Sequence, residues 1–177
     1  MNTEIKIRRA TAADANLISR LSEDTFRETF NGTCTDEDMD HFIAKCFTEK
    51  NILKELQNED DFYFIAYLDD EPTGYSRLKE DYAEYPAIKK YVALELKRIY
   101  VMQKYHNKKI GAALMAHAID FAVQKKFEAV WLGVWELNEK AMSFYKKWGF
   151  TDTGFTHTFY IGDTAQTDHW MIRLINL

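Results

Sequence analysis

Two hydrophobic patterns divide the first half of the chain into strands and helices. Short runs rich in β-branched and aromatic residues predict strands at residues 4–10, 62–68 and 73–79, the last two forming an antiparallel hairpin. Apolar residues three and four positions apart predict helices between the first two strands, beginning after Thr11 with Asp14 as a capping-box partner. The inward-facing positions of these helices are Ile18, Leu21, Thr25, Phe26, Met39, Phe42, Ile43, Phe47, Ile52, Leu53 and Leu56.

A βαβ unit follows in the second half. After a polar stretch at residues 80–92, which we expect to be a loop, ALELKRIYV at 93–101 alternates as a strand. A helix is expected at about 109–126, and AVWLGV at 129–134 is the next strand. The two strands should be parallel and joined by a right-handed crossover.

The end of the chain predicts one more helix and a hairpin. Asn138 can cap a helix that Gly149 ends. Residues 151–161 and 167–174 predict two antiparallel strands around the turn segment GDTAQ. The pattern as a whole indicates a mixed sheet flanked by helices, in a single α/β domain that spans residues 1–177.

Composition narrows the class of protein. The chain has 23 basic and 28 acidic side chains, a net charge of −5, which disfavours general nucleic-acid binding. No apolar run approaches the roughly 20 residues of a membrane span, and residues 1–9 lack the apolar core of a secretion signal. We therefore expect a cytoplasmic protein without membrane contacts. Cys34 and Cys46 belong to no cysteine or histidine pattern, so reduced thiols and no metal site are expected.

The stretch VMQKYHNKKIGAALM, residues 101–115, places cationic side chains where the expected helix begins. They are Lys104, His106, Lys108 and Lys109. A helix N-terminus already carries partial positive charge and disfavours cations, so this loop is a candidate anion site. Gly111 would let backbone N–H groups approach a phosphate closely. Spacing alone also permits an ordinary strand-to-helix turn with solvated lysines, because the chain has neither a P-loop nor a dinucleotide motif.

Two motifs and the order of the elements resemble the GCN5-related N-acetyltransferase (GNAT) superfamily. NEKAMSFYKKWGF, residues 138–150, is similar to the closing motif Asn-x-x-Ala-x-x-Phe-Tyr-x-x-x-Gly-Phe at every fixed position. HNKKIG, residues 106–111, falls on the pyrophosphate signature Arg/Gln-x-x-Gly-x-Gly/Ala, with His106 and Lys109 as departures from it. The resemblance implies an α/β fold with a mixed, mostly antiparallel central sheet, a parallel βαβ coenzyme-binding unit and flanking helices.

The resemblance also implies acetyl-CoA as the co-substrate. Backbone groups of residues 99–101 are expected to pair with the pantetheine arm, and the Val101 N–H to bind the thioester oxygen. Asn138 can combine a coenzyme contact with its role as a helix cap. The implied coenzyme-binding set is Ile99, Tyr100, Val101, His106, Asn107, Lys108, Lys109, Ile110, Gly111, Ala112, Asn138, Lys140, Ala141 and Tyr145.

Acetyl transfer to an amine requires proton transfers. An amine with a pKa of about 10.4 is mostly protonated at pH 7 and must lose a proton before it attacks. The resemblance implies Glu95 as the general base and Tyr145 as the general acid that protonates the departing thiolate. Strand alternation places Glu95 on the face that carries Ile99 and Val101. Each residue also has a simpler interpretation, an ion pair of Glu95 with Lys97 and a core position for the tyrosine.

The acceptor amine is suggested by resemblance within the superfamily. TFRETF at 25–30, GYSRLK at 74–79 and the tail at 159–174 look most like the PaiA-type branch, which is associated with polyamine acetylation. This implies direct transfer to an amine such as spermidine or spermine. Glu28, near Phe26 and Phe30 at the end of the first helix, is a candidate acidic contact for an amine. A protein N-terminus or lysine side chain is an alternative acceptor, and a non-catalytic acetyl-CoA-binding regulator is an alternative of another class. By the same resemblance, the tail strands are a candidate homodimer interface.

Overall fold

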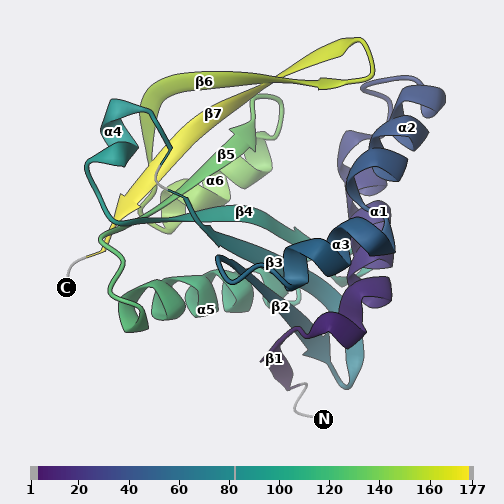
Figure 1. Cartoon of the computed structure of the whole chain (residues 1–177), viewed down its shortest axis with the longest axis horizontal. Coiled ribbons are helices and arrows are strands. Elements are labelled where there is room, and N and C mark those ends of the chain that lie inside the picture. The colour runs from purple at the N-terminus through teal and green to yellow at the C-terminus, as the bar shows by residue number, and fades with distance from the viewer. Residues whose placement is uncertain (1–3, 82, 176–177) are drawn as a thin grey trace.

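The computed structural model describes residues 4–81 and 83–175 of the 177-residue chain. Within them, seven strands form one sheet in the order β1-β2-β3-β4-β5-β7-β6 (Figure 1). The strands are β1 Ile5–Arg9, β2 Asp61–Leu68, β3 Glu71–Glu80, β4 Ala93–Val101, β5 Ala129–Trp135, β6 Thr151–Ile161 and β7 Thr164–Leu174. Neighbouring strands are antiparallel except β4 and β5, which run parallel. The mixed, mostly antiparallel sheet expected from the sequence is confirmed.

Helices cover both faces of this sheet (Figure 1). They are α1 Ala15–Phe30, α2 Asp36–Cys46, α3 Glu49–Leu56, α4 Pro86–Lys89, α5 Ile110–Gln124 and α6 Glu139–Lys147, with 3₁₀ turns at Ala12–Asp14 and Gln103–Tyr105. Helix α5 is the predicted crossover between β4 and β5. Helix α4 lies in the segment expected to be a loop, where Pro86 at the first position favours a helical φ. No helix of the described residues is long and apolar enough to cross a membrane.

The main apolar cores lie on opposite faces of the sheet. Strand β3 illustrates both, because Leu78 packs in the core beside α5 and Tyr75 packs in the core beneath α1 and α3. Leu78 is fully buried, and such a side chain contributes about 1.5–3 kcal/mol to stability. A third cluster joins α1 and α2 to the β6–β7 hairpin. The sheet is therefore held between α5 and α6 on one face and α1 and α3 on the other.

The turn before α1 is held by Asp14. Its carboxylate accepts hydrogen bonds from the Thr11 N–H at 2.8 Å and from two Arg8 guanidinium nitrogens at 2.9 and 2.7 Å. The capping box expected from the sequence is present. Because Arg8 belongs to β1, these bonds fasten the start of α1 to the edge of the sheet. They also lower the pKa of Asp14 to about 2.

A β-bulge in β4 breaks the alternation of its side chains. Leu96 and Arg98 lie opposite consecutive residues of β3, so Lys97 has no partner in that ladder. Leu96 and Ile99 consequently pack in the same core beside α5, although strict alternation would put them on opposite faces. Beyond the bulge, Val101 also packs on the α5 side. Residues after the bulge therefore lie on the face opposite to the one that strict alternation from the start of β4 predicts.

The β6–β7 hairpin folds over α1 and α2 (Figure 1). Only Gly162 and Asp163 connect the strands, because Ile161 already pairs with Thr164. The connection is tighter than the expected GDTAQ loop, and Gly162 has the positive φ, 58°, that short hairpin turns need. Ile161 is buried in the aromatic cluster around Phe30. This packing fixes the hairpin on the side of the sheet that carries α1.

Candidate active site

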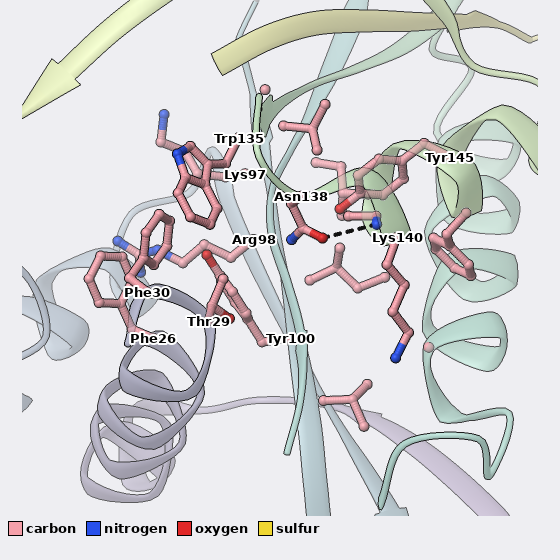
Figure 2. A pocket seen from close by; sticks show the side chains of 18 of the residues that line it. Phe26, Thr29, Phe30, Lys97, Arg98, Tyr100, Trp135, Asn138, Lys140 and Tyr145 are labelled. Carbon is pink, nitrogen blue, oxygen red and sulfur yellow. Dashed lines mark hydrogen bonds between the residues drawn. The ribbon is translucent and has the colours of Figure 1, made fainter. Parts of the chain in front are cut away.

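A cavity opens where β4 and β5 separate. The two parallel strands pair only over residues 93–95 of β4 and 129–131 of β5. Beyond these positions β4 continues to Val101 without a ladder partner on β5. The gap contains a cavity of about 620 Å³, lined by β4, the loop before α5, α6, α1 and β7 (Figure 2). The strand edge left open in this way can pair with an extended ligand.

Most of the predicted coenzyme-binding residues line this cavity. Those that do are Ile99 to Val101, His106, Asn107, Lys109 to Ala112, Asn138, Lys140, Ala141 and Tyr145. Lys108 is the exception, since it does not line the cavity and its ammonium lies over the Tyr105 ring, 5.9 Å from the centroid. The structure therefore brings together residues from β4, the loop and α6 that the sequence analysis grouped by resemblance.

The loop before α5 places backbone N–H groups beside the cavity. Asn107 and Lys109 have left-handed φ angles of 65° and 63°. Asparagine tolerates this conformation, whereas a lysine adopts it at a cost of about 1–2 kcal/mol. The Ala113 N–H donates to the Lys109 carbonyl, but in the described chain the N–H groups of residues 109–112 have no acceptor. A Cβ on Gly111 would meet one side-chain atom, at 3.8 Å, and would otherwise enter open space.

Lys140 adds positive charge beside these N–H groups, and His106 connects it to the end of β4. His106 Nε2 donates to the Val101 carbonyl oxygen at 2.9 Å, and Lys140 Nζ donates to His106 Nδ1 at 3.5 Å. These bonds fasten the loop to the end of β4 and bring the first turn of α6 next to it. Lys109 also lines the cavity. Unpaired N–H groups flanked by cationic side chains fit a phosphate-bearing ligand.

Helix α6 presents an amide and a phenol to the cavity (Figure 2). Asn138 caps the helix by accepting the Ala141 N–H at 3.0 Å. Tyr145 is 9% exposed and packs its ring against Phe150, 5.9 Å between centroids. In the described part of the chain its hydroxyl has no hydrogen-bond partner. Burial and the charge of Asp168 raise the pKa of Tyr145, so this hydroxyl keeps its proton at neutral pH.

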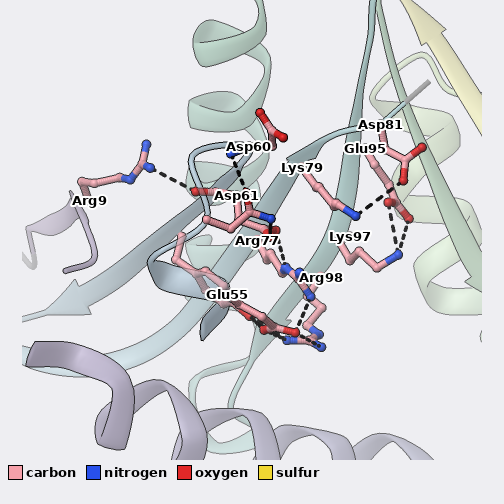
Figure 3. A network of polar contacts seen from close by, with 12 residues as sticks. Arg9, Glu55, Asp60, Asp61, Arg77, Lys79, Asp81, Glu95, Lys97 and Arg98 are labelled. Atoms are coloured by element: carbon pink, nitrogen blue, oxygen red, sulfur yellow. Dashed lines mark hydrogen bonds and ion pairs between the residues drawn. The ribbon is translucent and has the colours of Figure 1, made fainter. Parts of the chain in front are cut away.

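Glu95, the predicted base, does not line the cavity. Its side chain is 8% exposed and accepts hydrogen bonds from Lys97 Nζ at 3.1 and 3.2 Å (Figure 3). The bulge turns Glu95 away from Ile99 and Val101, so the expectation that the three share a face is wrong. The structure favours the simpler interpretation, in which Glu95 forms an ion pair on the sheet.

Glu28, the predicted substrate contact, lies beside the main cavity. Its carboxylate accepts the Gln103 N–H at 2.8 Å, which holds the turn after β4 against α1. It lines an adjoining hollow of about 250 Å³. Trp135 and Asn138 line both spaces. Glu28 therefore borders the main cavity through shared walls without reaching into it.

Aromatic and charged residues on the α1 side of the cavity are not predicted by the sequence pattern. Phe26 and Phe30 of α1 face Trp135 of β5 there (Figure 2). Arg98 reaches the same side, but its guanidinium is engaged. It donates to Glu55 at 3.0 Å (Figure 3) and to the Tyr63 hydroxyl at 2.7 Å. These aromatic positions matched helix and strand patterns, so nothing in the sequence distinguished them from core residues.

Asp168 of β7 is another lining residue that the sequence analysis missed. It lies opposite Trp135 in the ladder that joins β5 to β7. A Cβ on Gly133 would lie 3.1 Å from Asp168 Oδ2, so the carboxylate occupies the space over this glycine. A glycine inside the strand AVWLGV was the only local hint of a close approach.

The chain matches known acetyltransferases in sequence. The model of the acetyltransferase (GNAT) family matches residues 18–150. An uncharacterized N-acetyltransferase of Lactobacillus delbrueckii subsp. lactis is 31% identical over 166 residues, 94% of this chain and 95% of that protein. A spermidine N(1)-acetyltransferase of Thermoplasma acidophilum is 27% identical over 150 residues, 82% of this chain and 88% of that protein.

Solved structures have the same fold. The crystal structure of the PaiA N-acetyltransferase from Thermoplasma acidophilum in complex with coenzyme A has a TM-score of 0.78 at 24% identity, covering 97% of this chain and 99% of that chain. A GCN5-related N-acetyltransferase from Rhodopseudomonas palustris has a TM-score of 0.76 at 16% identity, covering 99% of both chains. At these identities the similarity establishes the arrangement of strands and helices.

Proposed function

Because this chain belongs to the acetyltransferase (GNAT) family, we propose that it transfers the acetyl group of acetyl-CoA directly to a primary amine bound in the same cavity. The observation that carries this proposal is the separation of β4 from β5. It places an open strand edge, the unpaired N–H groups before α5 and the Tyr145 hydroxyl around one space. An extended ligand with a phosphate group and a second, smaller substrate can meet in such a space.

The coenzyme fits the groups between β4 and α6. The N–H groups of residues 109–112 would hold its pyrophosphate, with Lys109 and Lys140 supplying charge. Backbone groups of residues 99–101 would pair with its pantetheine amides, next to the Asn138 side chain. Acetyl-CoA supplies the acetyl group already activated as a thioester. The Tyr145 hydroxyl, protonated at neutral pH, would donate its proton to the departing sulfur.

The first acceptor we propose is a polyamine such as spermidine or spermine. The similarity to the Thermoplasma acidophilum spermidine N(1)-acetyltransferase supports this choice. The rings of Phe26, Phe30 and Trp135 also support it, because aromatic faces attract ammonium groups. Asp168 in the cavity and Glu28 beside it supply carboxylates for more than one positive charge.

A binding measurement followed by an amine panel tests this function. Calorimetric titration should show that acetyl-CoA binds. Thiol release should then be faster with spermidine and spermine than with an aromatic monoamine, a lysine-containing peptide or a peptide with a free N-terminus. Release with the peptides alone would make the protein a peptide acetyltransferase. Binding of acetyl-CoA without thiol release for any amine would make it a regulator, and no binding would overturn the proposal.

A further inference from the structure

Asp168 is a carboxylate in the main cavity that the proposed roles leave unused. It is the only acidic side chain among the described residues that line the cavity. Strand β7 holds it opposite Trp135, and its Oδ2 lies 3.1 Å from the position that a Cβ on Gly133 would occupy. The lack of a side chain at Gly133 therefore gives this carboxylate its room beside β5.

The Asp168 carboxylate forms no hydrogen bond or ion pair with any described residue. The two side chains that act on it electrostatically are engaged elsewhere. Lys97 Nζ donates to Glu95 at 3.1 Å, and His169 Nδ1 lies 3.4 Å from Asp152 Oδ2. A carboxylate withdrawn from water without a partner is unfavourable in the free protein. Such a group is expected where a ligand supplies the missing positive charge.

The surroundings make Asp168 a stronger base than an exposed aspartate. Burial raises its pKa to about 6, and electrostatic interactions with His169 and Lys97 oppose this rise. It is therefore ionised at pH 7 but accepts a proton more readily than a solvated carboxylate. The titratable groups near it are Lys97 and Tyr100 of β4, Tyr145 of α6, His157 of β6 and the adjacent His169 of β7. Burial raises the pKa of both tyrosines, so they are neutral at pH 7.

Aromatic rings next to Asp168 suit an ammonium group. Trp135 lies directly across the ladder from Asp168 and packs against Phe30 with 4.9 Å between ring centroids. Both rings line the cavity together with the carboxylate. A primary ammonium can bind the carboxylate while its carbon chain and charge contact the rings. Glu95 has no such position, because it lies outside the cavity lining and is paired with Lys97.

We propose that Asp168 binds the ammonium group of the acceptor and takes its first proton as the general base of acetyl transfer. This inference rests on the proposed function. The freed lone pair of nitrogen attacks the thioester carbonyl carbon. The C–N bond forms, the C–S bond breaks, and sulfur takes the proton of Tyr145. The second proton of nitrogen passes through solvent to the Tyr145 oxygen, and Asp168 then releases its proton to solvent.

The Asp168→Asn variant tests this role through its pH profile. For the best amine, kcat/KM should fall roughly 10²- to 10⁴-fold at pH 7, the usual loss for a general base. The deficit should shrink toward pH 9.5, because more of the amine is then already neutral. The parent should lose activity below about pH 6 as Asp168 becomes protonated, and the variant should lack this inflection. Acetyl-CoA affinity, measured by calorimetry, should be unchanged.

Three further variants act as comparisons. Asp163→Asn alters an exposed aspartate in the turn of the same hairpin, outside the cavity lining, and should retain the parent profile. Gly133→Ala keeps the carboxylate but crowds it. The loss of kcat/KM in this variant should be smaller than in Asp168→Asn and should also shrink toward pH 9.5. Glu95→Gln should keep the inflection near pH 6, whereas loss of the inflection in this variant and not in Asp168→Asn would assign the base to Glu95.

The outcomes separate this inference from the proposed function. If the parent acetylates amines and Asp168→Asn stays within about threefold of it at every pH, well short of a general-base effect, Asp168 is not the base. A loss that is equal at all pH values, together with weaker acetyl-CoA binding, would also overturn the role, since it would indicate distorted structure. If the parent acetylates no amine, the proposed function fails and the inference fails with it.

Discussion

At the residue scale, Tyr145 combines core packing with an unpaired polar group. Its ring packs against Phe150, whereas its hydroxyl has no partner among the described residues and lines the cavity. Unlike the Tyr75 hydroxyl, which is fully buried in the core with no partner among the described residues, the Tyr145 hydroxyl is open to the cavity. The arrangement is therefore the one expected where a bound ligand supplies the hydrogen-bond partner.

Replacing Tyr145 by phenylalanine should remove the acid and keep the packing. We expect kcat to fall roughly 10²- to 10⁴-fold, with acetyl-CoA affinity and melting temperature unchanged. Steady-state kinetics, calorimetry and thermal unfolding measure the three quantities. Tyr160→Phe is the matched control, because Tyr160 is 60% exposed and lies outside the cavity lining. Turnover within about threefold of the parent would reject Tyr145 as the acid.

At the scale of the element, the start of α5 forms the candidate anion site through its backbone. The unpaired N–H groups belong to residues 109–112, and the left-handed conformations of Asn107 and Lys109 orient this turn. The side chain of Lys108 lies instead over Tyr105. Affinity for a phosphate should therefore depend more on close approach to the backbone than on the charge of Lys108, which the resemblance placed in the coenzyme-binding set.

Two substitutions in this loop should separate backbone from side-chain contributions. Gly111→Val adds atoms that would enter the open space of the cavity, and should weaken acetyl-CoA binding at least about tenfold, roughly 1.4 kcal/mol. Lys108→Ala should change affinity less than about threefold, because it removes an exposed charge. Calorimetric titration measures both, and thermal unfolding checks that each variant folds. Equally small effects of the two changes would reject the loop as the pyrophosphate site.

At the scale of the whole molecule, two aspartates make stability depend on pH in opposite directions. The bonds from Arg8 and Thr11 lower the pKa of Asp14 to about 2, so its stabilisation is present above about pH 4 and lost as pH falls through 2. Burial raises the pKa of Asp168 to about 6. The stability contributed by its protonated form is present below about pH 4 and lost as pH rises through 6.

Urea unfolding at pH 4 and pH 7.5 should reveal this contrast. Asp168→Asn should unfold like the parent at pH 4 and gain about 2–3 kcal/mol over it at pH 7.5, because the buried charge is gone. Asp14→Asn should lose about 1 kcal/mol at both pH values, a value reduced for screening because the Arg8 side chain is 47% exposed. A stability gap for Asp168→Asn that does not change with pH would show that its carboxylate is not destabilised by burial.

Local pattern and one motif predicted most of the fold and much of the candidate site. The spacing of apolar residues predicted β4, α5 and β5 and their parallel order, because such signals lie within one element and its nearest connection. The motif at residues 138–150 placed Asn138 and Tyr145 on one helix, and both line the cavity. The cationic side chains and Gly111 made the loop before α5 a candidate anion site, and only the resemblance assigned it to a pyrophosphate, because its conformation depends on backbone angles that lysine seldom adopts.

Tertiary structure alone decided which carboxylate faces the cavity. The bulge at Lys97 puts Glu95 on the face opposite to Ile99 and Val101, whereas alternation predicted that the three residues share a face. The sequence of a strand does not show where a bulge occurs. Asp168 reaches the cavity because β7 inserts beside β5 in a register that sets it opposite Trp135. That register results from pairing between segments far apart in the chain, and a slip of one residue would point every side chain of β7 to the other face.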